Sequence, residues 1–288
     1  MKQTTLKVKH DAELQDYIIE ATGKSRTAVK SLFAHQQVFV DGKNVSKYNF
    51  PVRQNQLITI NSVGTSQKEI AQNQLKIIFE DDDIIVIDKP AGILSVAAGN
   101  ANEITAYSIL RNHVKTLSSL NKIFIVHRLD KETSGLMLFA KNEKVKMILQ
   151  SNWDRIVLQR KYVAVVEGKM QNTEQTIVSY LKQNSAMQMY VSQNVENAQR
   201  AVLTYLTLKK NNKYSLIEVE LETGRKNQIR VQMQEIGHSI AGDKKYGGKS
   251  SPIGRLALHA QTLEFIHPIT RETMCFTTKI PKKFLVVF

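Results

Sequence analysis

The spacing of apolar residues near the start of the chain predicts a short amphipathic helix. Leu14, Tyr17 and Ile18 follow the i, i+3, i+4 spacing that places side chains on one helix face. Asp11 precedes this pattern and is expected to cap the helix, because its carboxylate can accept a backbone N–H. Gly23 is expected to end the helix, since glycine adopts the left-handed conformation of a helix C-terminus without strain.

A second short helix is predicted directly after the first. Ser25 is expected to cap it, and its apolar positions continue to about Ala34. Arg26 and Lys30 lie one turn apart on the outer side of this helix, where their charges face solvent. The N-terminal part of the chain therefore has the pattern of a small helical pair accompanied by short strands.

A polar stretch separates this part from the remainder of the chain. Residues 61–74 hold few large apolar side chains and begin with a run rich in Asn, Ser, Gly and Thr, which is typical of a linker. We therefore predict a first domain over residues 1–64, a linker over 65–75 and a second domain over 76–288.

The second domain is dominated by short apolar runs that predict strands. These runs are 76–79, 84–87, 123–126, 136–139, 162–166 and 214–219. Helical spacing is found around 106–116, 143–153 and 229–236. In a doubly wound fold, strands and helices alternate regularly, and in this segment they do not. The pattern predicts an α+β domain built on a mixed, mainly antiparallel sheet.

The charge of the chain indicates a polyanionic partner. Its 288 residues contain 40 Lys and Arg against 26 Asp and Glu, a net charge of +14. Such a balance is typical of proteins that bind nucleic acid. The single cysteine excludes an intramolecular disulfide, and no run approaches the roughly 18 apolar residues of a membrane span. We expect a cytoplasmic protein that contacts nucleic acid and no membrane.

The decamer from His127 to Leu136 is a candidate active-site loop, because apolar strands precede and follow it. Asp130 lies between Arg128 and Lys131, and nearby cations favour the ionised form of a carboxylate. An ionised carboxylate can act as a nucleophile or a general base. The alternative is a turn whose polar side chains only satisfy its own backbone.

A second polar segment, Thr223 to Arg230, follows a strand and opens a predicted helix. Arg225, Lys226 and Arg230 concentrate positive charge around the start of that helix. Such a cluster can bind phosphates or pair with a buried carboxylate. A solvated basic surface explains the same residues equally well.

Other sources of chemistry lack support in the sequence. The acidic run Glu80 to Asp83 lies between two apolar strands and is interpreted as a polar turn. The seven histidines are scattered without the spacing of zinc ligands, and no glycine-rich nucleotide-binding motif occurs. We therefore expect no metal and no cofactor.

These segments together resemble the RluA-type RNA pseudouridine synthases. His127 to Leu136 matches the family's His-Arg-Leu-Asp-x-x-Thr-Ser-Gly-Leu motif. Further segments match in the expected order over about Lys76 to Pro281; they are 80–92, 161–164, 223–230, 242–247 and 258–260. The N-terminal part resembles an S4 RNA-binding domain, with Ser25 and Arg26 opening its second helix. The resemblance implies the pseudouridine synthase catalytic fold preceded by a small S4-like α/β domain.

The resemblance implies that uridine within RNA is isomerised to pseudouridine without any cofactor. It makes Asp130 the catalytic aspartate and places Arg230 as its basic partner. Tyr162 matches the tyrosine that stacks on the target base, and Arg128 matches an arginine that enters the helix when the base flips out. Extruding a base costs a few kcal/mol, so groups that hold the extruded state have a physical purpose.

The resemblance also implies a partner and a set of RNA contacts. The expected partner is structured RNA, foremost ribosomal RNA, bound by a monomer. Besides Arg128, the expected contacts are Arg225, Lys226, Lys89, Arg26 and Lys30.

The chain departs from the family pattern at two places. Asn227 replaces the histidine usual in the fourth motif, and the segment beginning at Ser95 replaces a His-Pro pair.

Two other functions compete with this one. A non-catalytic RNA-binding factor for ribosome assembly would share the charge and the scaffold, and transfer RNA could replace ribosomal RNA as substrate. A carboxylate-based hydrolase would need a second acid near Asp130. The sequence contains no paired carboxylate motif for that reaction.

Overall fold

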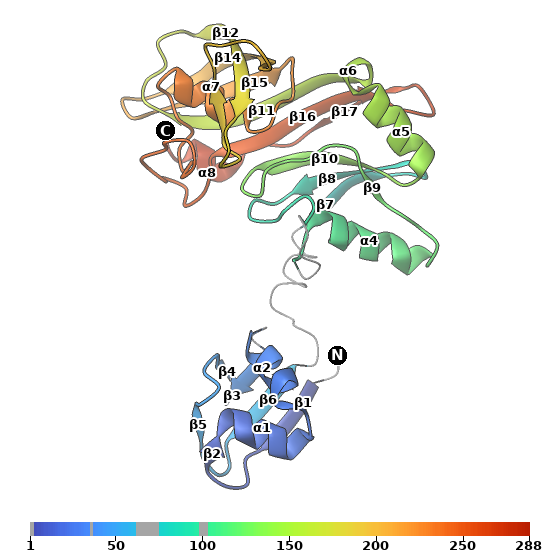
Figure 1. Ribbon diagram of the computed structural model, residues 1–288, viewed down its shortest axis with the longest axis vertical. Helices are drawn as coiled ribbons and strands as arrows, with labels where there is room; N and C mark the ends of the chain where they lie inside the picture. Colours follow the sequence, from blue (N-terminus) through green and yellow to red (C-terminus); the bar gives the residue numbers. More distant parts are fainter. Residues whose placement is uncertain (1–2, 35–36, 62–74, 98–102) are drawn as a thin grey trace. The chain divides into compact units, whose positions relative to one another are not determined.

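The chain forms two compact units, Met1–Gln74 and Leu75–Phe288, shown in Figure 1. The computed structural model describes residues 3–34, 37–61, 75–97 and 103–288. The predicted linker over 65–75 lies outside the described residues apart from Leu75, which is buried. Each unit has its own apolar core and is considered separately below.

The N-terminal unit packs two short helices against small antiparallel sheets. Its helices are α1 (Leu14–Thr22) and α2 (Arg26–Ala34). Its strands are β1 (Gln3–Lys7), β2 (Ala12–Glu13), β3 (Val38–Val40), β4 (Lys43–Asn44), β5 (Pro51–Val52) and β6 (Leu57–Asn61). In the described part of this unit, four strands form a sheet in the order β1-β6-β3-β4, and β2 pairs with β5. Leu14, Ile18 and Val29 point from the helices into the core.

Two predicted helix ends in this unit are confirmed. Gly23 ends α1 in the left-handed region, with φ of 65°, and its N–H donates to the carbonyl of Ile19. Ser25 Oγ accepts a hydrogen bond from the N–H of Ala28 at 3.2 Å, as expected of a cap of α2. Both features depend only on residues within one turn, which is why the sequence predicts them.

The predicted cap of α1 is wrong. The helix begins at Leu14, and the preceding Glu13 makes no side-chain cap. Asp11 Oδ1 instead accepts a hydrogen bond from the N–H of Gln54 at 2.8 Å, across 43 positions of sequence. A tertiary contact therefore uses the carboxylate that the local pattern assigned to the helix.

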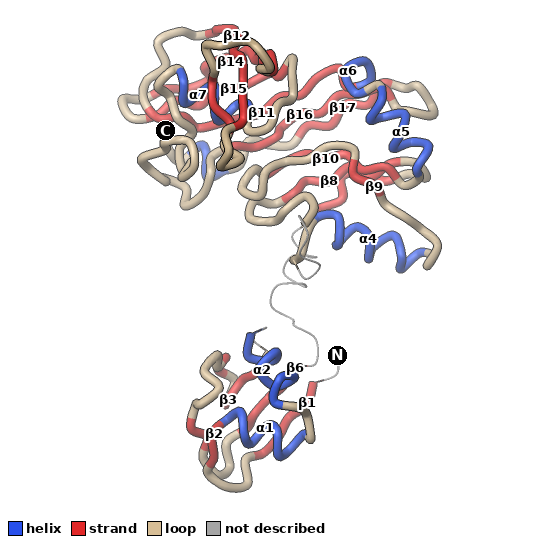
Figure 2. The backbone as a smooth tube through the Cα atoms, viewed as in Figure 1, coloured by secondary structure: helices blue, strands red, loops and turns tan. Residues whose placement is uncertain are grey.

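The second unit is built on one large sheet. Its strands are β7 (Lys76–Glu80), β8 (Ile84–Lys89), β9 (Phe124–Ile125), β10 (Ser134–Ala140), β11 (Val157–Glu167), β12 (Glu174–Gln183), β13 (Met189–Val191), β14 (Gln199–Lys210), β15 (Tyr214–Leu221), β16 (Leu258–Ile266) and β17 (Thr273–Thr277). Its described helices are α4 (Ala106–Leu117), α5 (Glu143–Ser151), α6 (Trp153–Ile156), α7 (Gln228–Glu235) and α8 (Lys282–Leu285). Figure 2 shows the predominance of strands in this unit.

The strand order confirms the predicted α+β class. Among the described residues, the main path is β13-β12-β14-β15-β11-β16-β10-β8-β7, with β17 beside β16 and β9 beside β10. Neighbouring strands are antiparallel except for β10 and β16, which are parallel. The polar stretch from Gln171 to Gln199 holds β12 and β13.

The pairing of β10 with β16 fixes the end of the candidate loop on the sheet. Gly135 lies opposite Ala260 of β16, with φ of 115°. A Cβ at Gly135 would lie 2.1 Å from the carbonyl oxygen of Ala260, so only glycine permits this approach. Tyr162 of β11 also pairs with Ala260. The loop that carries Asp130 is thereby brought beside β11.

No helix within the described ranges is long and apolar enough to cross a membrane.

Candidate active site

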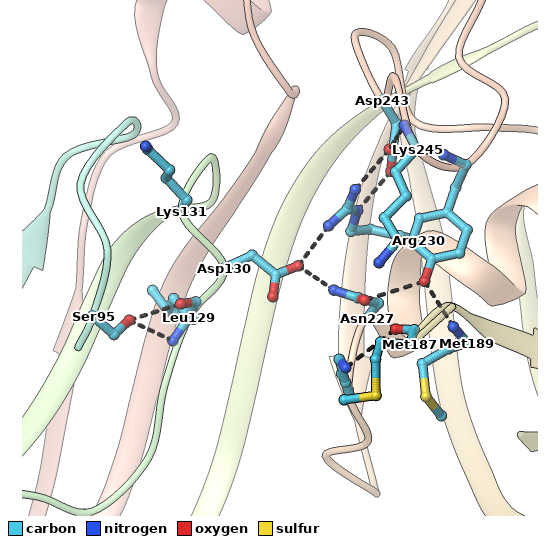
Figure 3. A network of polar contacts seen from close by, with 12 residues as sticks. Ser95, Leu129, Asp130, Lys131, Met187, Met189, Asn227, Arg230, Asp243 and Lys245 are labelled. Carbon is cyan, nitrogen blue, oxygen red and sulfur yellow. Dashed lines mark hydrogen bonds and ion pairs between the residues drawn. The ribbon is translucent and has the colours of Figure 1, made fainter. Parts of the chain in front are cut away.

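An ion-pair network centres on Asp130. Arg230, in the first turn of α7, donates from Nη1 to Asp130 Oδ2 at 2.7 Å (Figure 3). Its Nε and Nη2 donate to the two carboxylate oxygens of Asp243, each at 2.7 Å. Asp243 is fully buried. The structure thus joins two residues that the sequence analysis singled out and adds Asp243, to which it had assigned no role.

A second donor reaches the same carboxylate oxygen. Asn227 Nδ2 donates to Asp130 Oδ2 at 2.6 Å, and the hydroxyl of Tyr246 donates to Asn227 Oδ1 at 3.1 Å. The backbone N–H of Met189 in turn donates to the Tyr246 hydroxyl at 3.2 Å. From the sequence, Asn227 is only a departure from the family motif, and Tyr246 is only one residue of the matched segment 242–247. Their contacts become visible only in the folded chain.

An open pocket surrounds Asp130. Its charged and polar walls include Arg128, Asp130, Tyr162, Arg225, Asn227 and Arg230. Apolar side chains line the rest of it; these include Leu129, Leu221, Ile229 and Leu258. A concave, partly apolar pocket with converging polar groups is the usual form of a binding site for a small group such as a nucleobase.

Tyr162 projects from β11 into this pocket. Burial raises the pKa of its hydroxyl to about 12, and the negative charge of Asp130 adds to the effect while Arg160 opposes it. The hydroxyl is therefore protonated at neutral pH and can donate a hydrogen bond. Arg160 Nη2 donates to the carbonyl of Glu222 and lies against Gly224, where a Cβ would come within 2.4 Å of Nη1. The glycine of this turn makes room for Arg160.

Ser95 ties the Asp130 loop to the neighbouring segment. Its Oγ donates to the carbonyl of Leu129 at 2.7 Å and accepts from the N–H of Leu129 at 3.1 Å. Leu129 immediately precedes Asp130. Ser95 therefore holds both the N–H and the carbonyl of the residue next to the carboxylate. The departure at Ser95 therefore has a structural role in this chain.

The structure contradicts the expected RNA contact of Lys89. Its side chain is fully buried, and Nζ donates to the carbonyls of Pro90, Ile93 and Lys131 at 2.9, 2.8 and 3.2 Å. Burial lowers the pKa of this ammonium to about 8. Lys89 joins two loops of the site from within, and a charge so enclosed cannot reach a phosphate.

His127, the first residue of the loop motif, is a structural group. Its Nε2 accepts the N–H of Leu138 at 2.9 Å, and its ring lies 4.8 Å from that of Trp153. Burial lowers the pKa of His127 to about 3, and the charge of Arg160 adds to the effect. The imidazole is therefore neutral at physiological pH and holds the strand that follows the loop.

This burial predicts a pH-dependent stability. An unfolded histidine has a pKa of 6.5 against about 3 in the fold, so between these values the unfolded chain binds more protons. Relative to His127→Gln, the wild-type unfolding free energy is expected to drop by about 2 kcal/mol between about pH 7.5 and 5. Urea titrations at both pH values measure the difference. Glutamine can accept the same N–H without titrating, so an unchanged difference would contradict a buried neutral histidine.

The remaining predicted contacts are cations with exposed side chains. Arg128 and Arg225 line the pocket, and Arg225 Nε donates to the carbonyl of Arg200. Lys226 Nζ donates to the carbonyl of Met187 at 3.3 Å. In the separate N-terminal unit, Arg26 pairs with Asp16 at 3.1 Å, and Lys30 Nζ lies 5.9 Å from the ring centre of Tyr48.

The acidic run after β7 forms a turn, as predicted. Asp81 Oδ1 accepts the N–H groups of Asp83 and Ile84, each at 2.8 Å. Glu80 pairs with His113 at 2.7 Å and Lys141 at 3.0 Å. Within the described residues, no group of three or more His, Cys, Asp or Glu side chains is arranged to hold a metal ion.

Comparison with known proteins identifies similar chains. Residues 83–235 match the family described as RNA pseudouridylate synthase. The chain is 31% identical over 262 residues to the uncharacterized RNA pseudouridine synthase YhcT of Bacillus subtilis, covering 89% of this chain and 86% of that protein. It is 37% identical over 221 residues to ribosomal large subunit pseudouridine synthase D of Nitrosomonas europaea, covering 72% of this chain and 62% of that protein.

Solved structures share the fold at lower identity. The structure of human RNA pseudouridylate synthase domain containing 4 superimposes with a TM-score of 0.62 at 22% identity, over 76% of this chain and 94% of that chain. Human RNA pseudouridylate synthase domain containing 1 gives 0.60 at 24% identity, over 72% of this chain and 84% of that chain.

Proposed function

The chain belongs to the RNA pseudouridylate synthase family, and from this premise we propose that it isomerises uridine in ribosomal RNA with Asp130 as the catalytic carboxylate. The observation that carries the proposal is the position of Asp130, which lines a pocket with Tyr162 and is paired with Arg230 at 2.7 Å. The pairing places a fixed positive charge beside the carboxylate that is to act as nucleophile or general base.

The reaction redistributes bonds within one nucleotide. The N1–C1′ bond breaks, the base turns, and a C5–C1′ bond forms; C5 loses a proton and N1 gains one. No external oxidant, reductant or energy source is consumed, so the side chains of the pocket suffice. Asp130 faces the reacting nucleotide, and Tyr162 stacks on the base with its protonated hydroxyl available as a hydrogen-bond donor.

The proposed substrate is supported by charge and by relatives. The net charge of +14 suits a long polyanion. Relatives from Nitrosomonas europaea and Zymomonas mobilis are named ribosomal large subunit pseudouridine synthase D. Arg128 lines the pocket and is exposed, so it is placed to hold the strand from which the uridine is extruded. Arg225 and Lys226 extend this cationic surface along the start of α7.

We further propose that the N-terminal unit is an S4-like RNA-binding module. Its two helices packed on a small sheet support this assignment, as do the exposed Arg26 and Lys30 on α2. Arg26 forms an ion pair with Asp16, which partly neutralises its charge. Lys30 is therefore the stronger phosphate ligand of the two residues.

Reversing these two charges is expected to weaken RNA binding. The double variant Arg26→Glu, Lys30→Glu removes up to two phosphate contacts, so the slope of log K against log salt should decrease by about 1 to 2. Filter binding at several salt concentrations measures it. The matched control reverses exposed Lys115 and Lys144 on α4 and α5. If the control variant lost as much RNA affinity as the α2 variant, net charge would explain the loss, and a binding surface on α2 would be contradicted.

Tritium release tests the proposed function directly. Joining the base through C5 expels the hydrogen at that carbon, so RNA containing 5-tritiated uridine reports the isomerisation. Release from ribosomal RNA is the expected result. Release from transfer RNA alone would support the proposed activity and contradict ribosomal RNA as the substrate. Tight binding without release from either RNA would favour the assembly-factor alternative.

A further inference from the structure

We infer that Asn227, oriented by Tyr246, is a positioning residue that holds Asp130 by one oxygen and leaves the other to react. The inference rests on the proposed function of Asp130. It concerns which atoms fix the carboxylate, beyond the pairing with Arg230.

Both donors to Asp130 converge on the same atom. Asn227 Nδ2 lies 2.6 Å and Arg230 Nη1 2.7 Å from Oδ2. No donor among the described residues is hydrogen-bonded to Oδ1, and Figure 3 shows that oxygen free of dashed contacts. The terminal torsion of aspartate is broad, so a single contact leaves the carboxylate free to turn. Two donors on one oxygen from different directions restrict that rotation and distinguish Oδ1 from Oδ2.

Arg230 cannot supply this restriction alone. Its Nε and Nη2 are committed to the buried Asp243, which leaves Nη1 for Asp130. The guanidinium is held in place, but it contributes one hydrogen bond to the carboxylate. Asn227 provides the second.

The orientation of the Asn227 carboxamide is itself determined. Its φ of 55° is a left-handed conformation that asparagine tolerates better than most residues, and it places the side chain at the start of α7. The Tyr246 hydroxyl donates to Oδ1 of the amide, so the NH₂ group faces Asp130. Tyr246 is 1% exposed, and its hydroxyl accepts the N–H of Met189. The chain Met189, Tyr246, Asn227, Asp130 therefore has one consistent direction of donation.

Substitutions at Asn227 distinguish a role in positioning Asp130 by a hydrogen bond from a role that depends only on the shape of the side chain. Asn227→Gly keeps access to the left-handed backbone and removes the donor. Asn227→Asp keeps the shape and replaces the donor by a second carboxylate beside Asp130. A structural role predicts that the near-isosteric aspartate is the milder change. Positioning by a donated hydrogen bond predicts that it is the more severe one.

Single-turnover tritium release and RNA affinity are the measurements. Asn227→Gly is expected to slow release about 10- to 100-fold, since a hydrogen bond to an ionised group is lost. Asn227→Asp is expected to slow it further, and both should bind RNA within about 3-fold of wild type. The control is Asn197, an exposed asparagine with φ of 56°, where the same two substitutions should leave the rate unchanged.

A double-mutant cycle tests the part assigned to Tyr246. Tyr246→Phe removes the hydroxyl and keeps the ring, whose centre lies 4.9 Å from the Arg230 guanidinium carbon. It should slow release about 3- to 10-fold in the wild type and add no rate loss to Asn227→Gly, because the amide it orients is gone. Its effect on unfolding, through the N–H of Met189, should persist in both backgrounds.

The inference fails if Asn227→Asp is as active as wild type, or milder than Asn227→Gly. It also fails for Tyr246 if the rate losses add. These outcomes require that wild type releases tritium. Absence of release from the wild type would instead overturn the proposed function.

Discussion

Asp130→Asn is expected to abolish tritium release, by about 10³-fold or more, while RNA affinity changes less than about 3-fold. The carboxamide has nearly the same volume and can still accept from Arg230, so the pocket should retain its form. It lacks the negative charge that a nucleophile or general base needs. Single-turnover release and filter binding on the same RNA measure the two effects.

The control for this substitution is Asp154→Asn. Asp154 is an exposed carboxylate in α6, outside the residues that line the pocket. This variant should release tritium at the wild-type rate. Turnover by Asp130→Asn within about 10-fold of wild type would show that the carboxylate is dispensable and would overturn its assignment.

Arg230→Met is expected to lose both activity and stability. Asp243 is fully buried and holds two hydrogen bonds from this guanidinium, so the variant leaves a buried carboxylate without its partner. Breaking a buried pair on one side costs about 3 to 5 kcal/mol. Asp130 also loses one of its donors, and release should slow about 100-fold or more. Urea unfolding and single-turnover release measure the two losses.

Arg200→Met is the matched control for the stability loss. Arg200 forms an exposed pair with Glu222 at 2.9 Å, and both side chains are more than half exposed. Screening by solvent limits such a pair to about 1 kcal/mol or less. Equal destabilisation by the two variants would contradict the role assigned to the buried Arg230–Asp243 pair. Wild-type turnover by a folded Arg230→Met would contradict the proposed partner of Asp130.

The features that sequence alone determined are those that depend on neighbouring residues. The end of α1 at Gly23 and the cap of α2 at Ser25 follow from backbone preferences within one turn. Strands such as β8 and β10 follow from apolar runs long enough to be buried on both faces. The loop that carries Asp130 was identified because strands enclose it and because its residues match a family motif.

Tertiary structure decided what each polar side chain contacts. Asp130 meets Asn227 and Arg230 across 97 and 100 positions, and no local pattern encodes those distances. Lys89 is a case in which the sequence predicted a contact that the fold excludes. The family motif around Lys89 indicates an RNA contact, but in the folded chain three backbone carbonyls enclose the ammonium and remove it from solvent.

One physical reason explains why the secondary-structure elements could be predicted from the sequence and the contacts of the site could not. Helix ends, turns and strand runs are set by torsional preference and by the periodic burial of side chains, which neighbouring residues determine. The site depends on the parallel pairing of β10 with β16, which juxtaposes Gly135 and Ala260. That pairing is selected by packing of the whole sheet. The sequence by itself therefore determined the elements and the family of this protein, whereas only the tertiary structure decided which oxygen of Asp130 is held and by which residues.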